Sequence, residues 1–191
     1  MDDRVAAVLR RDPVLDALIE RYGPITLEPA QDPFGRLIRS ITHQQVSLAA
    51  GDAILERLKA SVELTPDGIR SSDRETLLSA GLSGQKADYV VDIADTFIER
   101  SYERETFVDM DDEAVIEELT DIHGVGPWTA KMFLIFCLGR TDVFPVEDLG
   151  IRRAMEHQID PDLTREEMIT RAETWRPYRS YGSLYLWESI D

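Results

Sequence analysis

The stretch from Pro127 to Leu138 is apolar almost all round and is followed by Gly139. A helix without a polar face has to be surrounded by other parts of its own chain. We therefore predict a central buried helix here, with the rest of the fold built around it. Hydrophobic residues make up 43% of the 191 residues, which is enough to supply the covering layers.

Helix start and stop signals punctuate most of the remaining sequence. Asp12-Pro13 and Asp32-Pro33 each combine an N-cap with a proline at the first helical position. No strand pattern, repeat or low-complexity tract is apparent. We predict a single all-α domain over 1–191, with two helical lobes around a cleft. Lobe one covers about 30–110, and lobe two covers about 111–191 plus the N-terminal helix. Apolar spacing and caps predict helices over 13–23, 33–46, 47–60, 72–81, 85–101, 112–120, 127–138, 148–158, 164–175 and 180–189.

Cysteine content and hydropathy exclude several classes of protein. The only cysteine is Cys137, which excludes an internal disulfide, a four-cysteine zinc site and a cysteine-ligated iron–sulfur cluster. The N-terminus lacks the basic-then-apolar order of a secretory signal, and no apolar run approaches membrane-spanning length. We expect a cytoplasmic monomer with no membrane partner and no metal held by side chains.

The charge is strongly acidic, with 37 acidic and 21 basic residues and a net charge of −16. Only three of the basic residues are lysines: Lys59, Lys86 and Lys131. Such a chain should repel DNA at ordinary salt. A dispersed acidic, lysine-poor surface also suits concentrated salt, where the Debye length is only about 3 Å at 1 M. We expect a halophilic protein; an ordinary acidic protein is the alternative.

A glycine-containing turn, His123-Gly124-Val125-Gly126, precedes the central helix. Two glycines separated by one residue allow positive φ and close approach of another backbone. Pro127 opens the next helix where its missing N–H costs nothing, and the N–H groups at that helix start suit a phosphate. A turn between two helices that binds no ligand is the alternative.

Several blocks, taken in order, resemble the helix-hairpin-helix (HhH-GPD) superfamily of DNA glycosylases, and within it the DNA-3-methyladenine glycosylase II branch. The hairpin alone is weakly specific, whereas the ordered set is highly specific and covers roughly residues 30–190. The chain is too short for the extra N-terminal β-domain of some members, so it resembles the compact form. The blocks are the hairpin over 119–131 and the segments 41–47, 81–87, 144–153, 175–181 and 184–187.

The resemblance implies a monofunctional glycosylase of base excision repair, acting on double-stranded DNA with a damaged base. It would flip out an alkylated purine, 3-methyladenine or 7-methylguanine, and hydrolyse the N-glycosidic bond. The family match places the catalytic aspartate at Asp148, with Glu147 as the fallback. An ionised carboxylate stabilises the oxocarbenium-like sugar and orients water. An aspartate before a helix is otherwise commonly an N-cap.

The same resemblance implies the other site residues. The lysine nucleophile of bifunctional relatives falls at Trp128 here, and Lys131 lies three positions later, so water is the expected nucleophile. Trp128 and Trp187 would stack on the base, with core packing as the alternative, and Met132 replaces a pocket tyrosine of some relatives. The DNA backbone would contact His123, Gly124, Val125, Gly126 and Thr129, whose hairpin carbonyls are candidates to hold a monovalent cation.

The residue that fills the gap left by the flipped base is not evident from the match. The wedge position of some relatives aligns near 83–85, where no large apolar residue occurs. The candidates are Gln85 and, from the other loop, His43 and Gln44. Two rival functions remain open: a glycosylase for a neutral lesion such as uracil, hypoxanthine or an oxidised purine, and a non-catalytic helix-hairpin-helix DNA-binding module.

Overall fold

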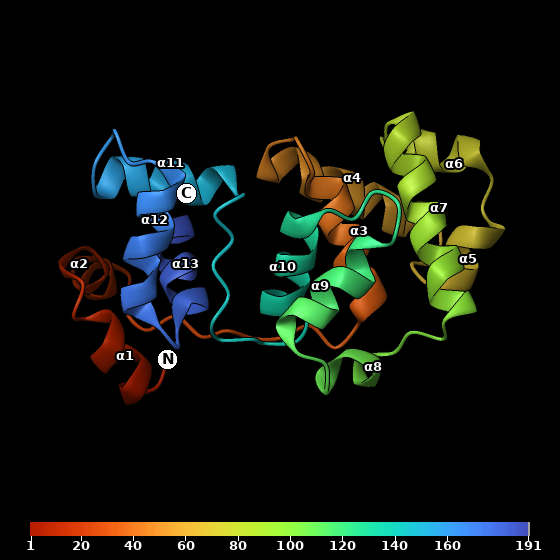
Figure 1. Ribbon diagram of the computed structural model, residues 1–191. Coiled ribbons are helices and arrows are strands. Elements are labelled where there is room, and N and C mark those ends of the chain that lie inside the picture. The colour runs from red at the N-terminus through yellow and green to blue at the C-terminus, as the bar shows by residue number, and fades with distance from the viewer. Residues whose placement is uncertain (191) are drawn as a thin grey trace. The chain divides into compact units, whose positions relative to one another are not determined.

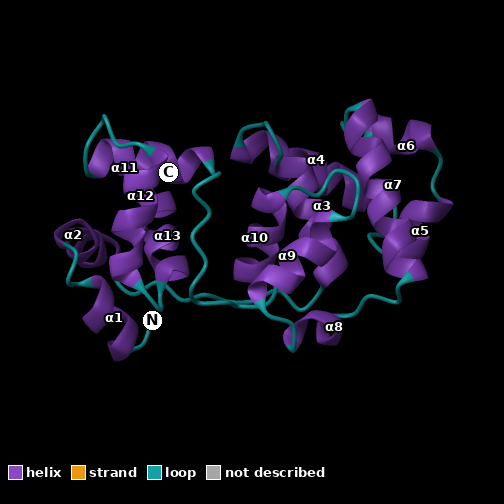
Figure 2. Cartoon of the chain, in the orientation of Figure 1, coloured by secondary structure: helices purple, strands orange, loops and turns teal. Residues whose placement is uncertain are grey.

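The computed structural model describes residues 1–190, and within this range every regular element is a helix (Figure 2). The all-α prediction is confirmed. The chain divides into two compact units: residues 30–133, and residues 1–29 together with 134–191. No helix among the described residues is long and apolar enough to cross a membrane.

The first unit is continuous in sequence and is organised around α7 (Gly84–Glu99), which packs against α3 (Pro33–His43) and α5 (Pro66–Ser71) (Figure 1). Its aromatic rings meet edge to face, as in the pair Phe107–Phe133 at 5.1 Å between centroids. The other helices of this unit are α4 (Leu48–Ser61), α6 (Arg74–Ser79), α8 (Arg104–Val108), α9 (Asp112–Thr120) and most of α10 (Pro127–Phe136).

The second unit combines the two ends of the chain. A single hydrophobic core joins Leu9 and Leu15 of the N-terminal segment to Met155, Trp175 and Tyr185 of the C-terminal one. The Tyr185 hydroxyl donates to the Gly23 carbonyl at 2.8 Å. The helices are α1 (Asp3–Leu9), α2 (Pro13–Tyr22), α11 (Leu149–Gln158), α12 (Arg165–Ala172), the 3-10 turn η1 (Glu173–Trp175) and α13 (Arg179–Glu188).

The prediction of a buried central helix is confirmed for α10, although the helix ends at Phe136 rather than at 138. Residues 132–135 are all buried. The division between the units falls inside α10, and not near residue 110 as the sequence suggested. The reason is that the turn before α10 bonds to the first unit: the Gln44 side chain donates to the Gly124 carbonyl at 3.0 Å.

Other boundaries differ where a local signal was misread. The helix from Pro33 ends at His43, because Gln45 has φ +57 and cannot continue it. Ser72 closes α5, while Asp73 caps α6 through its bond from the Thr76 N–H. The sequence analysis missed α1, α5 and α8, each at most seven residues long, because so few residues carry little periodicity.

Candidate active site

Asp148 stands at the point where an extended segment turns into α11. Its carboxylate Oδ1 accepts the Ile151 N–H at 2.9 Å, which makes it the N-cap of the helix. The same oxygen accepts the indole N–H of Trp187 at 2.9 Å. Two donors from different elements therefore fix the orientation of a half-buried carboxylate. The capping role and a chemical role are compatible, because both use the anionic form.

Gly150 makes room for this arrangement. A Cβ added there would lie 2.9 Å from Asp148 Oδ1 and 3.2 Å from Trp187 Cδ1. The Trp187 ring itself lies against Phe136, with centroids 5.7 Å apart and planes tilted by 34°. Sequence analysis placed Asp148 and Trp187 in one site from the family resemblance; the structure brings them into direct contact.

The neighbouring acid, Glu147, is exposed. Its backbone carbonyl accepts a hydrogen bond from Arg152 at 2.6 Å, and the Val146 carbonyl accepts another from the same guanidinium at 3.2 Å. Arg152 thus stabilises the backbone turn that immediately precedes Asp148. The Trp187 bond distinguishes Asp148 from Glu147 within this cluster.

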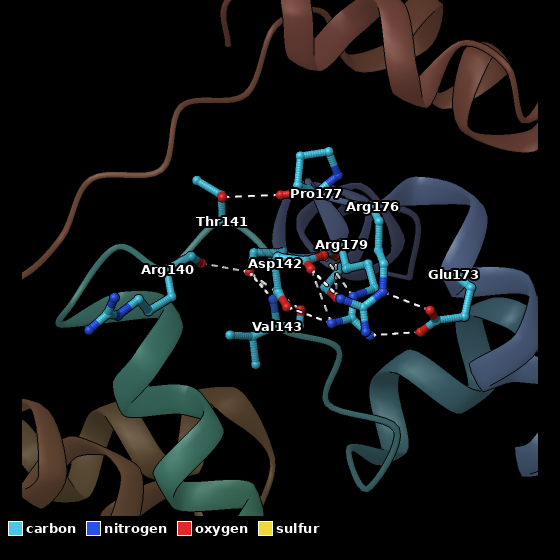
Figure 3. A network of polar contacts seen from close by, with 10 residues as sticks. Arg140, Thr141, Asp142, Val143, Glu173, Arg176, Pro177 and Arg179 are labelled. Carbon is cyan, nitrogen blue, oxygen red and sulfur yellow. Dashed lines mark hydrogen bonds and ion pairs between the residues drawn. The ribbon is translucent and has the colours of Figure 1, made fainter. Parts of the chain in front are cut away.

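The extended segment before Asp148 is fastened to the start of α13 (Figure 3). The Ser180 hydroxyl donates to the Arg140 carbonyl at 2.7 Å and accepts the Val143 N–H at 3.0 Å. The Ser180 N–H donates to the Thr141 carbonyl at 2.9 Å. Further along, residues 143–146 are buried. The hydrogen bonds to Ser180 and the burial of residues 143–146 therefore fix the backbone that leads to Asp148.

Asp142 anchors the same segment through two arginines (Figure 3). Arg179 donates to its carboxylate at 2.7 Å and to its backbone carbonyl at 2.8 Å. Arg176 donates to the other carboxylate oxygen at 2.8 Å, and both arginines also bond Glu173. Arg176 and Arg179 are therefore engaged within the protein. Arg153, which follows Arg152 on α11, is exposed.

The hairpin over 123–126 belongs to the other unit. Gly124 has φ +90, and a Cβ there would meet the ring of Tyr89 on α7 at 2.2 Å. Gly126 has open space around its Cα, and its carbonyl accepts the Ala130 N–H as α10 begins. The two glycines thus serve different ends: Gly124 permits close packing and Gly126 leaves the helix start uncovered.

Two side chains of the predicted hairpin contact set differ in accessibility. His123 is 68% exposed, its Nδ1 lies 2.7 Å from Asp92 Oδ2, and its ring stands edge-on to Tyr89. Thr129 is buried, so its side chain cannot touch DNA, and its hydroxyl instead accepts a hydrogen bond from Gln44. The side chain of Thr129 lies inward in the first turn of α10, and the placement of Thr129 at the DNA backbone stays a prediction.

The predicted base-pocket residues on α10 follow one another at one-turn intervals. Trp128 is half-buried and Met132 is buried, and Phe136, the ring partner of Trp187, comes one turn later. Lys131 comes three residues after Trp128 and is not a member of this row. Within residues 1–190, no three His, Cys, Asp or Glu side chains gather as metal ligands.

The side chains of two of the three predicted duplex-probing residues form hydrogen bonds within the protein. His43 is packed by Gly51 and bonds the Arg39 carbonyl at 2.7 Å and Asp52 at 3.1 Å. Gln44 bonds the hairpin. Only Gln85 is exposed, in the first turn of α7. The loop between α3 and α4 instead exposes Gln45 and Val46, and Leu48 is exposed at the start of α4.

Comparison with known proteins places these two clusters in a family. Residues 38–179 match the model of the HhH-GPD superfamily base excision DNA repair proteins. The chain is 33% identical over 179 residues to DNA-3-methyladenine glycosylase 1 of Schizosaccharomyces pombe, covering 90% of this chain and 78% of that protein. It is 31% identical over 228 residues to the DNA-3-methyladenine glycosylase of Saccharomyces cerevisiae, covering 97% and 75%.

The chain spans 66% of the Bacillus subtilis protein YfjP, to which it is 30% identical. Among solved structures, it superimposes on the Schizosaccharomyces pombe 3-methyladenine DNA glycosylase in complex with abasic DNA with a TM-score of 0.88, at 31% identity, covering 97% of this chain and 95% of that one. A Clostridium acetobutylicum 8-oxoguanine glycosylase/lyase is 21% identical, with a TM-score of 0.81, and shares the fold.

Proposed function

Because the chain belongs to the HhH-GPD superfamily of base excision DNA repair proteins, we propose that it is a DNA-3-methyladenine glycosylase. It hydrolyses the N-glycosidic bond of alkylated purines in duplex DNA. The similarity to two fungal DNA-3-methyladenine glycosylases supports the substrate class. The observation that carries the chemistry is the carboxylate of Asp148, oriented by Ile151 and Trp187 at the start of α11.

Departure of the base leaves positive charge on the deoxyribose, next to C1′. An anionic Asp148 facing C1′ would stabilise that charge, and preorganised electrostatic contacts of this kind are worth about 10²–10³ in rate. The bonds from Ile151 and Trp187 both end on Oδ1. They hold the carboxyl plane while Asp148 orients the attacking water.

The nucleophile is water. The hairpin position used by a lysine in bifunctional relatives is Trp128, and Lys131 lies almost a turn away along α10. Without an amine there, no Schiff base with C1′ forms and the DNA strand stays intact at an abasic site. Asp148 and water together then account for the whole reaction.

Alkylated purines such as 3-methyladenine and 7-methylguanine are cationic. Electron-rich indole rings attract cations over their faces by about 0.5–2 kcal/mol, so Trp128 and Trp187 would hold the flipped base. Met132 adds a polarisable thioether beside this row. The Trp187 N–H is already donated to Asp148, which leaves its ring for stacking.

The hairpin would bind phosphate through backbone N–H groups at the start of α10, a mode that tolerates a net charge of −16. The carbonyls of Ile122 and Gly124 each accept one protein hydrogen bond. Since a carbonyl has two lone pairs, they fit a monovalent cation, whose charge would add to the attraction for phosphate. The setting that suits this charge is the cytoplasm of a halophile, with the enzyme acting as a monomer.

One experiment tests the function. The protein is incubated in KCl with methylated duplex DNA, released bases are identified by mass spectrometry, and the strand is checked before and after alkali. We expect free 3-methyladenine and 7-methylguanine, breakage only after alkali, and no adduct trapped by borohydride. Release of uracil, hypoxanthine or an oxidised purine alone would establish the neutral-lesion alternative, and binding without release would establish a non-catalytic module.

A further inference from the structure

Gln44 links the α3–α4 loop to the hairpin within the unit over 30–133. Its side-chain amide donates to the Gly124 carbonyl at 3.0 Å and to the Thr129 hydroxyl at 3.1 Å. It is also the last residue before Gln45, whose φ of +57 turns the chain into the exposed α3–α4 loop. A single residue therefore belongs to the loop by its backbone and to the hairpin by its side chain.

The backbone of Gln44 is fixed from a third direction. Lys86, in the first turn of α7, donates to the Gln44 carbonyl at 2.7 Å and to the Thr42 carbonyl at 3.0 Å. These are carbonyls at the C-terminal end of α3, where the helix dipole favours a cation. Burial lowers the pKa of Lys86, as expected for an amine that works inside the protein.

The side chain of Thr129, which belongs to this network, is too buried to contact DNA directly. Thr129 is 1% exposed, so its hydroxyl can influence DNA only through what it binds. On the other side of the link, Val46 of the α3–α4 loop and Leu48 at the start of α4 are exposed, at 39% and 56%. Exposed apolar side chains on a loop of a DNA-binding protein are suited to wedge between base steps.

We propose that Gln44 is a positioning residue that makes the α3–α4 loop (residues 44–47), together with the adjoining first residue of α4, and the hairpin one rigid element. When the hairpin binds phosphate, the link determines where the loop presents its exposed side chains to the duplex. Gln44 itself does not enter the DNA. The inference rests on the proposed DNA-glycosylase function, but it concerns the distortion of the duplex and not the cleavage of the base.

The test measures loop insertion without requiring catalysis. A duplex carries a tetrahydrofuran abasic analogue with 2-aminopurine opposite, whose fluorescence rises when that base is unstacked, and anisotropy with undamaged duplex measures phosphate binding. The variants are Gln44→Ala, Gln44→Glu, which keeps the shape but removes both donors, Thr129→Val, which removes the buried acceptor, and Thr129→Ser, which keeps it.

We expect Gln44→Ala, Gln44→Glu and Thr129→Val each to reduce the fluorescence change about 5-fold or more, the effect of a lost hydrogen bond. Affinity for undamaged duplex should change less than about 2-fold, because the hairpin N–H groups remain. Thr129→Ser should keep the signal, and adding Thr129→Val to Gln44→Ala should cause no further loss, because Gln44→Ala already removes the bonds to both Gly124 and Thr129.

Three outcomes would overturn the proposal. A normal signal in Gln44→Glu would show that the amide donors are dispensable. A further loss when Thr129→Val is combined with Gln44→Ala would mean that Thr129 acts independently of Gln44. An equal loss of undamaged-duplex binding in all variants would mean a damaged hairpin. If the wild-type protein releases no base yet shows these fluorescence differences, the proposed function fails while the inference stands.

Discussion

Trp187 donates its indole N–H to the carboxylate of Asp148 at 2.9 Å, across 39 residues of sequence. The bond joins the end of α13 to the start of α11, so Trp187 orients the carboxylate in addition to the stacking that we propose for its ring. Helix packing agrees with this link, since α11 and α13 pack against each other. The orientation of the acid thus depends on a residue near the C-terminus.

Asp148→Asn should silence the enzyme without unfolding it. Asparagine caps a helix as well as aspartate does, so the melting temperature should stay close to that of the wild type. Loss of the charge facing the oxocarbenium ion should slow single-turnover release of 7-methylguanine by at least ~10², with binding to lesion DNA retained. The matched control is Glu147→Gln; if that variant loses the activity and Asp148→Asn keeps it, Glu147 is the acid.

Trp187→Phe retains an aromatic ring but removes the donor to Asp148. Hydrogen bonds to charged groups contribute about 1.5–3 kcal/mol, so we expect roughly 10-fold slower base release in single-turnover kinetics. Trp175→Phe is the control, since Trp175 also donates to a carboxylate, that of Asp12, at 2.9 Å. It should lower the melting temperature and leave the rate per folded molecule nearly unchanged. Equal rates for Trp187→Phe and wild type would contradict the orienting role.

The two hairpin glycines should respond differently to alanine. Gly124→Ala forces a side chain into φ +90 and against Tyr89, which should cost about 1–3 kcal/mol of folding stability. Gly126→Ala meets nothing in the protein within 4 Å, so its melting temperature should be normal. Its affinity for damaged and undamaged duplex should fall together, because phosphate contacts carry no base information. Unchanged affinity in Gly126→Ala, measured by anisotropy, would remove the helix start from the DNA-binding surface.

Asp12 should make the fold sensitive to acid. It is buried, and Arg171 donates to both of its oxygens at 2.8 and 3.0 Å. Burial alone would raise the pKa of Asp12, but the bonds from Arg171 and Trp175 outweigh burial and lower it. The stabilisation is therefore present above the unfolded-state pKa of about 3.9 and is lost as pH falls through the lower folded-state pKa.

Asp12→Asn should accordingly destabilise the protein at neutral pH by about 3 kcal/mol, since it leaves Arg171 unpaired. Its melting temperature should decline less steeply than that of the wild type below about pH 4. Thermal unfolding across pH checks both statements. Parallel curves for the two proteins would mean that Asp12 titrates normally.

Salt should raise both stability and activity over the low range. Screening weakens repulsion among the 37 acidic residues and between the protein and DNA. Counterion release, which makes most DNA binding weaker in salt, needs basic side chains on phosphate, and Arg176 and Arg179 are held by Asp142 and Glu173. Melting temperature and base-release rate, measured across KCl, should rise together from dilute buffer toward molar salt. A base-release rate that falls monotonically with KCl concentration would contradict the halophile proposal.

Local signals predicted the parts of the fold that depend on neighbouring residues. Asp148 as the start of a helix, the bounds of α9 and the open turn before Pro127 were all readable from caps, glycines and apolar spacing. The catalytic assignment of Asp148 came from family resemblance, and remains a prediction. Short helices such as α5 were not predicted, because six residues are too few to show a clear helical periodicity of apolar side chains.

Contacts between distant residues were not readable. Nothing in the sequence near Gln44 indicates that its amide bonds a carbonyl 80 residues later, so it was predicted to probe DNA. The same holds for His43, whose ring nitrogens bond the Arg39 carbonyl and the Asp52 carboxylate. The pairing of Arg176 and Arg179 with Asp142 was equally hidden, because Asp142 precedes them by more than 30 residues.

The division of the chain has a consequence for its biogenesis. The unit over 30–133, with the hairpin, is complete once the ribosome has released that stretch, and domains fold as units during synthesis. The unit that carries Asp148 combines residues 1–29 with the C-terminal segment. Asp12 and Gly23 are synthesised early, but their partners Arg171 and Tyr185 are synthesised late. A nascent chain would thus complete the unit with the hairpin before the unit with Asp148. Premature termination would leave a fragment without the carboxylate that we propose as catalytic.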